Sequence, residues 1–357
     1  MSDAGGTDRR PTMRDVAERA GVSKSLVSLV LRGERWVAAD KRRRVQQAAD
    51  ELGYRINVAA RSLSAVRTKT VGVLSADLRN PLLTDIVEQV GLILEEAGFS
   101  PLMTSAVHAS KGPGGPRIDS RAVGALRDLG VEGMLIVGSV PDRGALAKIV
   151  GDMPLVVAAA GAEGLVADVV RNDDHLGMRL IIDYLVTRGH SSIAHLGGVG
   201  GGVAEDRVAG YRAAMEHHGL EEEIVIAEAD FTEDSGYRGT AQLLRRAKAV
   251  TAIAAVNDLA AVGALSAAAD CGLVIPDDLA VTGYDDTFVA AIRQVSLTSV
   301  NPDSSGIAAM AARCLLDRIE TPDSEPVEHL LPPRLVTRAS ASAAMARNAT
   351  GGASPSN

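Results

Sequence analysis

Two hydrophobic periodicities divide the chain near residue 70. Before that position, apolar residues recur three and four places apart within short segments, which is the spacing of amphipathic helices. After it, short runs of Val, Ile, Leu and Ala alternate with longer helical stretches. Strands that alternate with helices favour parallel sheets with crossover helices. The two periodicities therefore predict a small all-α head followed by a larger α/β body.

The sequence pattern of the head predicts a helix-turn-helix. Its first helix spans 13–20 and is followed by a turn at Gly21, and Ser23 is a suitable N-cap for a second helix over 24–31. A third helix, from about 39 to 52, braces the pair. In such units the N-terminal side chains of the second helix enter the DNA major groove. The head is therefore a candidate DNA-binding domain.

The apolar runs of the body predict a series of buried strands. They cover 70–74, 133–137, 155–157, 166–170, 192–196, 224–227, 251–256 and 279–282. Helices over 83–97 and 174–188, each followed by a glycine, stand between some of them. Ligands of such proteins bind in a crevice at the carboxyl ends of the parallel strands. We expect the binding site of the body at that edge.

Charge is distributed unevenly along the chain. Residues 1–69 carry 15 Lys and Arg against 8 Asp and Glu, a net charge of +7, whereas the remainder carries 22 against 37, a net charge of −15. A basic head suits contact with DNA phosphates, and an acidic body is repelled by them. An ordinary charged surface is the alternative. The run Arg42–Arg44 either adds to the attraction or is simply a basic helix surface.

Composition excludes several classes of protein. The chain is 46% hydrophobic and 23% charged, as in globular proteins. Neither an apolar leader nor a bilayer-spanning run stands in the sequence, so we expect a cytoplasmic protein without membrane contact. The two cysteines, Cys271 and Cys314, do not indicate a disulfide framework. Because neither a metal-ligand spacing nor a Ser-His-Asp order is found, we expect no metal, no cofactor and no enzymatic activity.

Short motifs identify the family that the chain resembles. Those of the head are Asp15–Ser23, Val27–Ser28, Arg43–Val45, Leu52–Tyr54 and Asn57–Leu63. Those of the body are Arg188–His190, Arg207–Tyr211, Asp230–Phe231, Ser235–Tyr237, Asn257–Asp258, Gly283–Asp286, Leu297–Val300 and Pro333–Val336. Over about 12–340 the chain resembles the lactose/galactose repressor family. This resemblance implies a homodimeric, sequence-specific transcription regulator, most commonly a repressor, that binds a palindromic operator in double-stranded DNA.

The resemblance also implies a domain division, with a body similar to periplasmic sugar-binding proteins. The expected parts are a helix-turn-helix head at 11–56, a hinge helix and linker at 57–69, an effector-binding and dimerisation domain at 70–340, and a disordered tail at 341–357. The expected lobes of the body are lobe 1, from 70–169 and 299–324, and lobe 2, from 170–298 and 325–340.

By the same resemblance, Lys24, Ser25 and Leu29 touch base edges. Lys24 can donate to guanine and Ser25 to several bases, whereas Leu29 offers apolar contact, for example to a thymine methyl group. A solvated helix face is the alternative for the two polar residues, and local packing is the alternative for Leu29. The residues at the family's phosphate-contacting positions are Thr12, Ser23, Ser28, Trp36 and Tyr54.

The segment 57–64 matches the family's hinge helix, which folds on DNA and inserts a leucine into the minor groove. Leu63 stands at that wedge position, and Asn57 and Arg61 flank it. An isolated helix of this length is marginal in water, so we expect it to form on DNA against its twin. The alternative is a plain linker helix with Leu63 packed on protein.

Four body residues match family positions that contact an effector, namely Arg207, Phe231, Asn257 and Asp285. A forked donor, an aromatic face, an amide and a carboxylate suit a polyol such as a carbohydrate. Leu82 and Leu83 stand where aromatic residues are common in the family. We expect them to line the lobe 1 wall of the site and to make it less polar than usual.

Three functional hypotheses follow. The first is a regulator controlled by a small molecule, a sugar or a sugar-like compound, in the cleft between the lobes. The second is a regulator controlled by a protein partner, or by nothing, with a vestigial cleft, and the apolar lobe 1 wall supports it. The third, a sugar-handling enzyme or a transport receptor, shares the fold of the body but leaves the basic head and Leu63 unexplained.

Overall fold

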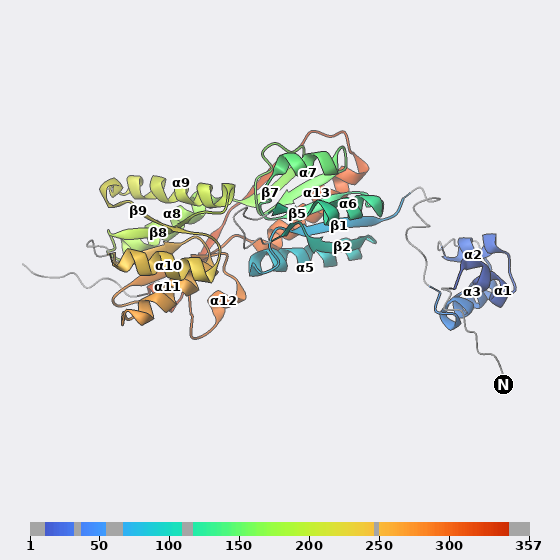
Figure 1. Ribbon diagram of the computed structural model, residues 1–357, viewed down its shortest axis with the longest axis horizontal. Coiled ribbons are helices and arrows are strands. Elements are labelled where there is room, and N and C mark those ends of the chain that lie inside the picture. Colours follow the sequence, from blue (N-terminus) through green and yellow to red (C-terminus); the bar gives the residue numbers. More distant parts are fainter. Residues whose placement is uncertain (1–10, 32–36, 55–66, 109–116, 246–249, 343–357) are drawn as a thin grey trace, which may run out of the picture. The chain divides into compact units, whose positions relative to one another are not determined.

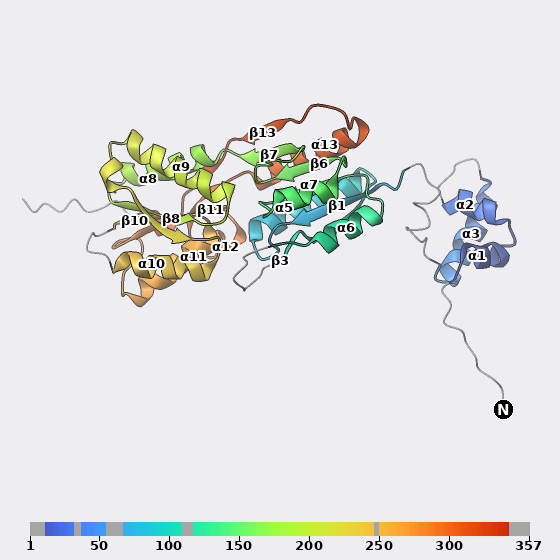
Figure 2. The ribbon, with the colours of Figure 1, turned by 45° about the horizontal axis from the view of Figure 1, so that its top comes forward.

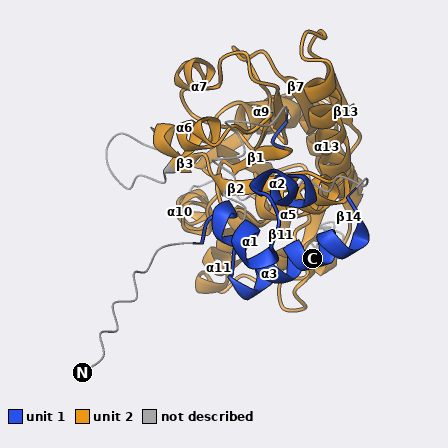
Figure 3. Ribbon diagram, turned by 90° about the vertical axis from the view of Figure 1, so that its right-hand side faces the viewer, with its two compact units in different colours: residues 1–68 blue, residues 69–357 orange. Residues whose placement is uncertain are grey.

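The computed structural model describes residues 11–31, 37–54, 67–108, 117–245 and 250–342. The chain forms two compact units, residues 1–68 and residues 69–357 (Figure 3). We call these units the head and the body. No helix in these described ranges is long and apolar enough to cross a membrane.

Three helices form the head, as the sequence predicts. They are α1 (Met13–Ala20), α2 (Lys24–Leu31) and α3 (Ala39–Glu51). Val16, Val27 and Val45, one from each helix, are completely buried in a common core. Burying a side chain of this size stabilises a fold by about 1.5–3 kcal/mol, so these three contacts hold the helices together.

Local hydrogen bonds set the helix boundaries of the head. Thr12 caps α1 reciprocally: the Asp15 N–H donates to Thr12 Oγ1 at 3.4 Å, and the Thr12 N–H donates to Asp15 Oδ2 at 2.6 Å. Gly21 ends α1 with a φ of 60°, a conformation that favours glycine. The Leu26 N–H donates to Ser23 Oγ at 3.2 Å, which confirms Ser23 as the predicted cap of α2.

The first sheet of the body is entirely parallel and defines lobe 1. Its strands in spatial order are β13 (Glu328–Leu331), β7 (Asp168–Asn172), β6 (Leu155–Ala158), β5 (Met134–Val137), β1 (Thr70–Ser75) and β2 (Ser100–Ser105). A small ribbon of β3 (Val107–His108) and β4 (Arg117–Ile118) follows β2.

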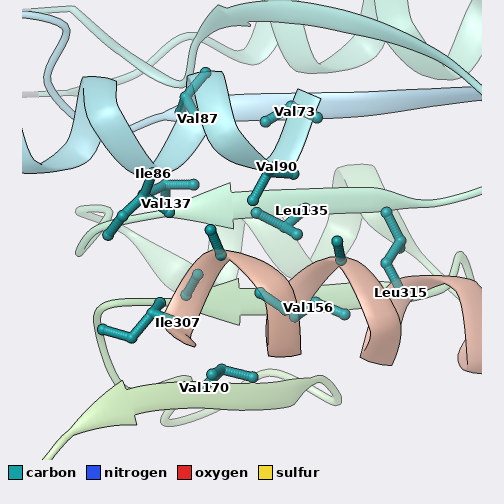
Figure 4. Packing of buried hydrophobic residues seen from close by; sticks show 14 of the residues in the cluster. Val73, Ile86, Val87, Val90, Leu135, Val137, Val156, Val170, Ile307 and Leu315 are labelled. Atoms are coloured by element: carbon teal, nitrogen blue, oxygen red, sulfur yellow. The ribbon is translucent and has the colours of Figure 1, made fainter. Parts of the chain in front are cut away.

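Two pairs of helices enclose the lobe 1 sheet. The pairs are α5 (Pro81–Glu96) with α13 (Ser304–Glu320), and α6 (Ser120–Asp128) with α7 (Arg143–Val150). Ile86 of α5 and Ile307 of α13 share one buried core with Leu135 of β5 (Figure 4). The other face of the sheet packs against α6 and α7 through a second core that contains Val123 and Leu146.

The second sheet of the body defines lobe 2. Its strands in spatial order are β14 (Arg334–Val336), β12 (Thr298–Asn301), β11 (Ala280–Tyr284), β10 (Ala252–Ala255), β8 (Ile193–Gly198) and β9 (Val225–Ala229). All pair in parallel except β14, which runs antiparallel to β12. The short elements η1 (Glu221–Glu223) and α12 (Phe288–Ala291) lie in its connections, and η2 (Ala339–Ala341) follows β14.

Helices also cover both faces of the lobe 2 sheet (Figure 1). The pairs are α8 (Asp174–Thr187) with α9 (Gly202–His217), and α10 (Glu233–Leu244) with α11 (Asp258–Asp270). A Cβ on Gly236 of α10 would overlap the Ala260 backbone, and one on Gly263 of α11 would overlap the Glu233 carbonyl oxygen. The two helices therefore pack backbone against backbone, which larger residues would prevent.

The chain passes between the lobes three times, after Asn172, after Asn301 and after Leu331. The sequence predicts the third passage near residue 325 and all of 325–340 in lobe 2. In the structure, β13 pairs with β7, with Glu328 opposite Val169, so residues 328–331 belong to lobe 1. This edge strand is largely exposed and lacks the continuous apolar run that indicates a buried strand.

Candidate functional sites

The first turn of α2 presents polar side chains to the outside. Ser23, Lys24 and Ser25 are exposed, whereas Val27 and Val30 are buried in the head core. The helix is thus anchored by one face while its N-terminal turn remains accessible. A helix-turn-helix presents its base-contacting residues to a major groove in this way.

The remaining residues of the expected interface on α2 are less accessible. Ser28 and Leu29 are both half-buried. Leu29 packs against the head core, so part of this side chain contributes to local packing, which is the alternative that the sequence left open. Tyr54 is also half-buried against that core, and its N–H donates to the Ala49 carbonyl oxygen at 2.8 Å.

Thr12 combines an exposed position with a structural role. Its hydroxyl donates to Asp15 Oδ2 at 2.7 Å as part of the α1 cap. The exposed end of this helix still carries backbone N–H groups, which attract anions such as phosphate. The other residues expected to contact DNA, Trp36, Asn57, Arg61 and Leu63, lie outside the described residues.

The three consecutive arginines of α3 do not have equivalent surroundings. Arg44 Nη2 donates to the Ala20 carbonyl oxygen at 2.6 Å, at the end of α1. Arg42 Nη2 donates to the Val37 carbonyl oxygen at 3.5 Å. Arg43 is exposed. At Arg44 the structure therefore favours a role in holding α1 and α3 together.

Arg207 is the centre of a buried ionic network in lobe 2. Its side chain is 3% exposed, and each guanidinium nitrogen has a partner. Nε donates to Asp174 Oδ1 at 2.9 Å, Nη2 donates to Asp285 Oδ1 at 3.3 Å, and Nη1 donates to the Val256 carbonyl oxygen. The guanidinium carbon also lies 3.6 Å from the centroid of the Tyr284 ring, within cation–π distance.

Two asparagines extend this network. Asn172 Nδ2 donates to Tyr284 Oη at 2.7 Å and to Asp174 Oδ1 at 3.1 Å. Asn257 caps the N-terminus of α11 and donates from Nδ2 to the Phe231 carbonyl oxygen at 3.1 Å. Because Asn172 ends β7 of lobe 1, its hydrogen bonds tie the first interlobe passage to lobe 2.

The structure brings together the four lobe 2 residues that the sequence singles out. Arg207 contacts Asp285, and its guanidinium carbon lies 5.9 Å from the centroid of the Phe231 ring. Asn257 contacts Phe231. Asp174 belongs to this network but is not among the residues that the sequence singles out. Its position shortly after a predicted strand is the signal that could have indicated it.

Burial shifts the titration of the network. It raises the pKa of Asp285 to about 7, although the charge of Arg207 opposes the shift. It also raises the pKa of Asp258 to about 6, against hydrogen bonds from Ser299 and Thr287. Burial would lower the pKa of Arg207, but the surrounding carboxylates outweigh it and raise this pKa above its usual value. The guanidinium is therefore cationic, and its carboxylate partner Asp285 titrates near neutral pH.

Lobe 1 and lobe 2 are in contact within the body. Arg79 of lobe 1 holds Asp77 through bonds from Nε to Oδ1 at 3.0 Å and from Nη2 to Oδ2 at 2.9 Å. The carboxylate of Asp230 in lobe 2 acts electrostatically on both side chains. Direct contacts between the lobes include Val203 in the first turn of α9, which packs against the lobe 1 core. Arg171 on β7 also pairs with Asp206 of lobe 2 at 3.2 Å.

The aromatic ring of Phe231 is partly covered. A Cβ on Gly200 would overlap this ring, so the glycine-rich loop 197–202 lies directly against it. Phe231 is otherwise half-buried against the lobe 2 core. The ring is thus held in place from two sides, and its remaining exposed surface is the part that a ligand can contact.

Leu82 and Leu83, which the sequence predicts to line the lobe 1 wall of the effector site, are 6% and 8% exposed and pack in the lobe 1 core. Both leucines stand in the first turn of α5, where Asn80 caps the helix and Pro81 occupies its first position. Arg207, Asn257 and Asp285 are buried to a similar degree, so the role of the two leucines stays a prediction.

Comparison with protein families gives two matches. Residues 12–57 match the model of bacterial regulatory proteins of the lacI family, and residues 182–341 match the periplasmic binding protein-like domain. The regulator CelR of Thermobifida fusca is 34% identical over 93% of this chain and 98% of its own length. The repressor PurR of Erwinia tasmaniensis is 33% identical over 92% of this chain and 96% of its own length.

Solved structures show the same arrangement of elements. The lac repressor dimer bound to operator and the anti-inducer ONPF superposes with a TM-score of 0.80 at 26% identity, over 93% of this chain and 99% of the repressor. A complex of the regulator CelR with cellobiose has a TM-score of 0.67 at 32% identity, over 93% of this chain and 100% of the other.

Proposed function

This chain belongs to the LacI family of bacterial regulatory proteins and is a DNA-binding transcription regulator, and on that premise we propose that it is a dimeric repressor of a palindromic operator, controlled by a small molecule. One observation carries the DNA-binding part of the proposal. Val27 and Val30 anchor α2 in the head core while Ser23, Lys24 and Ser25 of its first turn are exposed.

Each head residue has an assigned role in this proposal. Lys24 and Ser25 contact base edges, and the exposed part of Leu29 contacts an apolar base surface. Phosphate contacts, which set the register of the head, come from Thr12, Ser23, Ser28, Trp36 and Tyr54. Leu63 enters the minor groove at the centre of the operator, with Asn57 and Arg61 beside it.

The effector, a sugar or a sugar-like compound, binds between the lobes of the body. Its contacts are the exposed part of Phe231 and the polar groups of Arg207, Asn257 and Asp285. The relative CelR, solved with cellobiose, supports this class of ligand. Because these polar groups are already hydrogen-bonded within lobe 2, ligand hydroxyls must replace internal hydrogen bonds. An effector therefore shifts the lobes only by the difference in its affinity for their two arrangements.

Exposed apolar residues support a dimer through the body. Leu92 on α5 and Met103 on β2 are 57% and 50% exposed in lobe 1, and Phe288 at the start of α12 is 72% exposed in lobe 2. Large apolar side chains on a surface mark interaction sites when they gather in patches. The relative solved as a dimer on operator DNA supports the same assembly. Two heads can then bind the two halves of a palindrome.

A second candidate function is a regulator that responds to a protein partner or to no signal. One observation favours it: every guanidinium nitrogen of Arg207 is already bonded within lobe 2. The two candidates differ in one measurement, the operator affinity in the presence of a panel of mono- and disaccharides. A shift that Phe231→Ala abolishes supports the effector-controlled repressor, and the absence of any shift supports the second candidate.

The DNA-binding part is tested by selection of genomic fragments with the purified full chain at low salt, which preserves phosphate contacts. We expect the bound fragments to share a palindrome with a flexible central step. The variant Lys24→Ala, Ser25→Ala is the control, and it should lose the shared motif while it still retains DNA nonspecifically. Recovery of fragments without any common motif by the wild-type chain would overturn the proposal.

A further inference from the structure

A groove with a cavity volume of about 380 Å³ lies between α8 and α9 of lobe 2. Figure 2 shows these two helices side by side on one face of the lobe 2 sheet. Cavities of this volume fall in the range that holds small molecules in proteins. The groove is made by helix residues that carry none of the DNA or effector contacts proposed above.

Small residues on α9 open the groove, and two contacts bound it. At Gly210 the helices nearly touch, because a Cβ there would lie 2.9 Å from the His175 Cα atom. About two turns farther on, His218 Nε2 lies 2.6 Å from Asp183 Oδ1 and joins the helices again. Between these points, the small side chains of Ala213 and Ala214 on α9 face the groove and leave space open, and His217 lines its far end.

Cationic and imidazole side chains from both helices line this space. Arg179 comes from α8, where it is 57% exposed and lies 3.5 Å from Asp183. His175 of α8 and His217 of α9 are both exposed and contribute two imidazoles. The carboxylate at the edge of the groove, Asp173, accepts the Leu176 N–H at 2.9 Å as the cap of α8. Its charge is thus partly satisfied by the helix terminus.

We propose that this groove binds a small organic anion, a carboxylate or a phosphate ester, through Arg179, His175 and His217. A guanidinium matches the planar geometry of carboxylate and phosphate oxygens, and imidazole N–H groups add directional donors. The apolar floor of Leu176, Ala213 and Ala214 accommodates the carbon part of such a ligand. Among the described residues, no group of three or more His, Cys, Asp or Glu could hold a metal ion, so the two imidazoles do not indicate a metal site.

The groove lies beside the Arg207 network, so a bound ligand can affect that network. Asp173 and His175 flank Asp174, which accepts the hydrogen bond from Arg207 Nε. Gly210, at the other wall, stands one helical turn after Arg207 on α9. A ligand that moves the first turn of α8 therefore moves a charged partner of Arg207 directly.

The test is calorimetric titration of the full chain with inorganic phosphate and, separately, with succinate, at constant ionic strength. We expect at least one probe to bind, and which one binds distinguishes a phosphate site from a carboxylate site. Arg179→Gln and Ala213→Leu, which fills the groove without a change in charge, should each raise the dissociation constant by about tenfold or more. The matched control is Arg238→Gln, on α10, because Arg238 is 63% exposed and also pairs with an Asp at the i,i−4 position.

Hydrogen exchange locates the ligand independently. The binding probe should protect amides of residues 173–179 and 210–217 more than those of α10. The proposal is overturned if neither probe binds the wild-type chain, if the groove variants bind as the control does, or if protection appears elsewhere. None of these outcomes depends on operator binding, so the groove and the proposed repressor function are tested independently.

Discussion

In the head, Lys24 and Ser25 project from the first turn of a helix and are exposed, whereas in the body Arg207 and Asp285 are 3% and 4% exposed and bonded to each other. Both pairs are the polar residues on which a recognition proposal rests. The head holds its backbone rigid through a buried apolar face and leaves the recognition side chains unburied. The body instead holds its recognition side chains through their own hydrogen bonds.

This difference separates stability from recognition in one unit and joins them in the other. A side chain on the exposed turn of α2 can change with little effect on the fold, because its removal leaves no buried partner without a hydrogen bond. Removal of a charge from the body network leaves another charge buried and unpaired, which is costly. We therefore expect substitutions in the Arg207 network to lower stability first, and substitutions at Lys24 and Ser25 to lower affinity alone.

The largest expected effect comes from Arg207→Met, which leaves Asp174 and Asp285 buried without their cationic partner. Loss of one member of a buried ionic network costs about 3–5 kcal/mol. Urea unfolding of the body measures this loss, with Arg238→Met as the exposed-arginine control, for which we expect less than about 1 kcal/mol. Equal destabilisation by the two substitutions would show that the Arg207 network does not hold lobe 2 together.

A smaller effect is expected from Asp285→Asn, and it depends on pH. Burial raises the folded-state pKa of Asp285 from 3.8 to about 7, so the folded protein retains a proton that the unfolded chain has lost. Its contribution to stability is present at low pH and declines as the pH rises between these two values. Asp285→Asn should flatten most of that decline.

The contribution of Asp77 to stability has the opposite pH dependence, so this residue serves as a comparison. Burial would raise its pKa, but hydrogen bonds from Arg79 outweigh burial and lower it below 3.8. Its contribution is present above that value and is lost as the pH falls, so Asp77→Asn should leave the neutral-pH decline unchanged. Urea unfolding at several pH values compares both variants with the wild-type chain. The network interpretation fails if Asp285→Asn retains the wild-type decline.

Within the head, Ser23→Ala should have a moderate effect because it removes the cap of α2. Loss of an N-cap hydrogen bond destabilises a helix by about 1 kcal/mol. Hydrogen exchange of the α2 amides in the full chain reports this as faster opening. Ser25→Ala, at an exposed position within the helix, is the control. If both variants exchange alike, Ser23 does not set the start of the helix.

Lys24→Ala should have the smallest effect on stability and a clear effect on recognition. An exposed substitution of this kind changes the free energy of unfolding by less than about 0.5 kcal/mol. Loss of one base contact should weaken binding to the selected operator by about tenfold or more. Fluorescence anisotropy with operator DNA and with scrambled DNA measures the specific and the nonspecific affinity. Lys148→Ala in the body is the control. Equal weakening on both DNAs would assign Lys24 to phosphate contact.

The sequence predicted the head well because its determinants are local. Helical spacing gave α1, α2 and α3, and the caps at Thr12, Ser23 and Gly21 act within four residues of the positions that they fix. In the body, buried strands such as β1 and β5 carry continuous apolar runs and were also predicted. The strand β2 was missed because it lies at an exposed edge and its residues have no such run.

The candidate effector residues were predicted as a group, but their internal bonding was not. Arg207 and Asp285 stand 78 positions apart in the sequence, and only the tertiary fold of lobe 2 decides that they contact. The same is true of burial at Leu82 and Leu83, which depends on how the first turn of α5 meets the lobe 1 sheet. Sequence can indicate which functional side chains are present, whereas tertiary contacts decide which of them remain available to a ligand.

The three passages between the lobes determine when each part can fold during synthesis. The described head ends at residue 54 and uses contacts among neighbouring helices only, so it can form early on the ribosome. Lobe 1 lacks its edge strand until residue 331 has been made, and lobe 2 lacks β14 until residue 336. The unit that binds DNA is thus complete while about five-sixths of the chain is still to be translated, and both lobes of the body are completed almost together at the end.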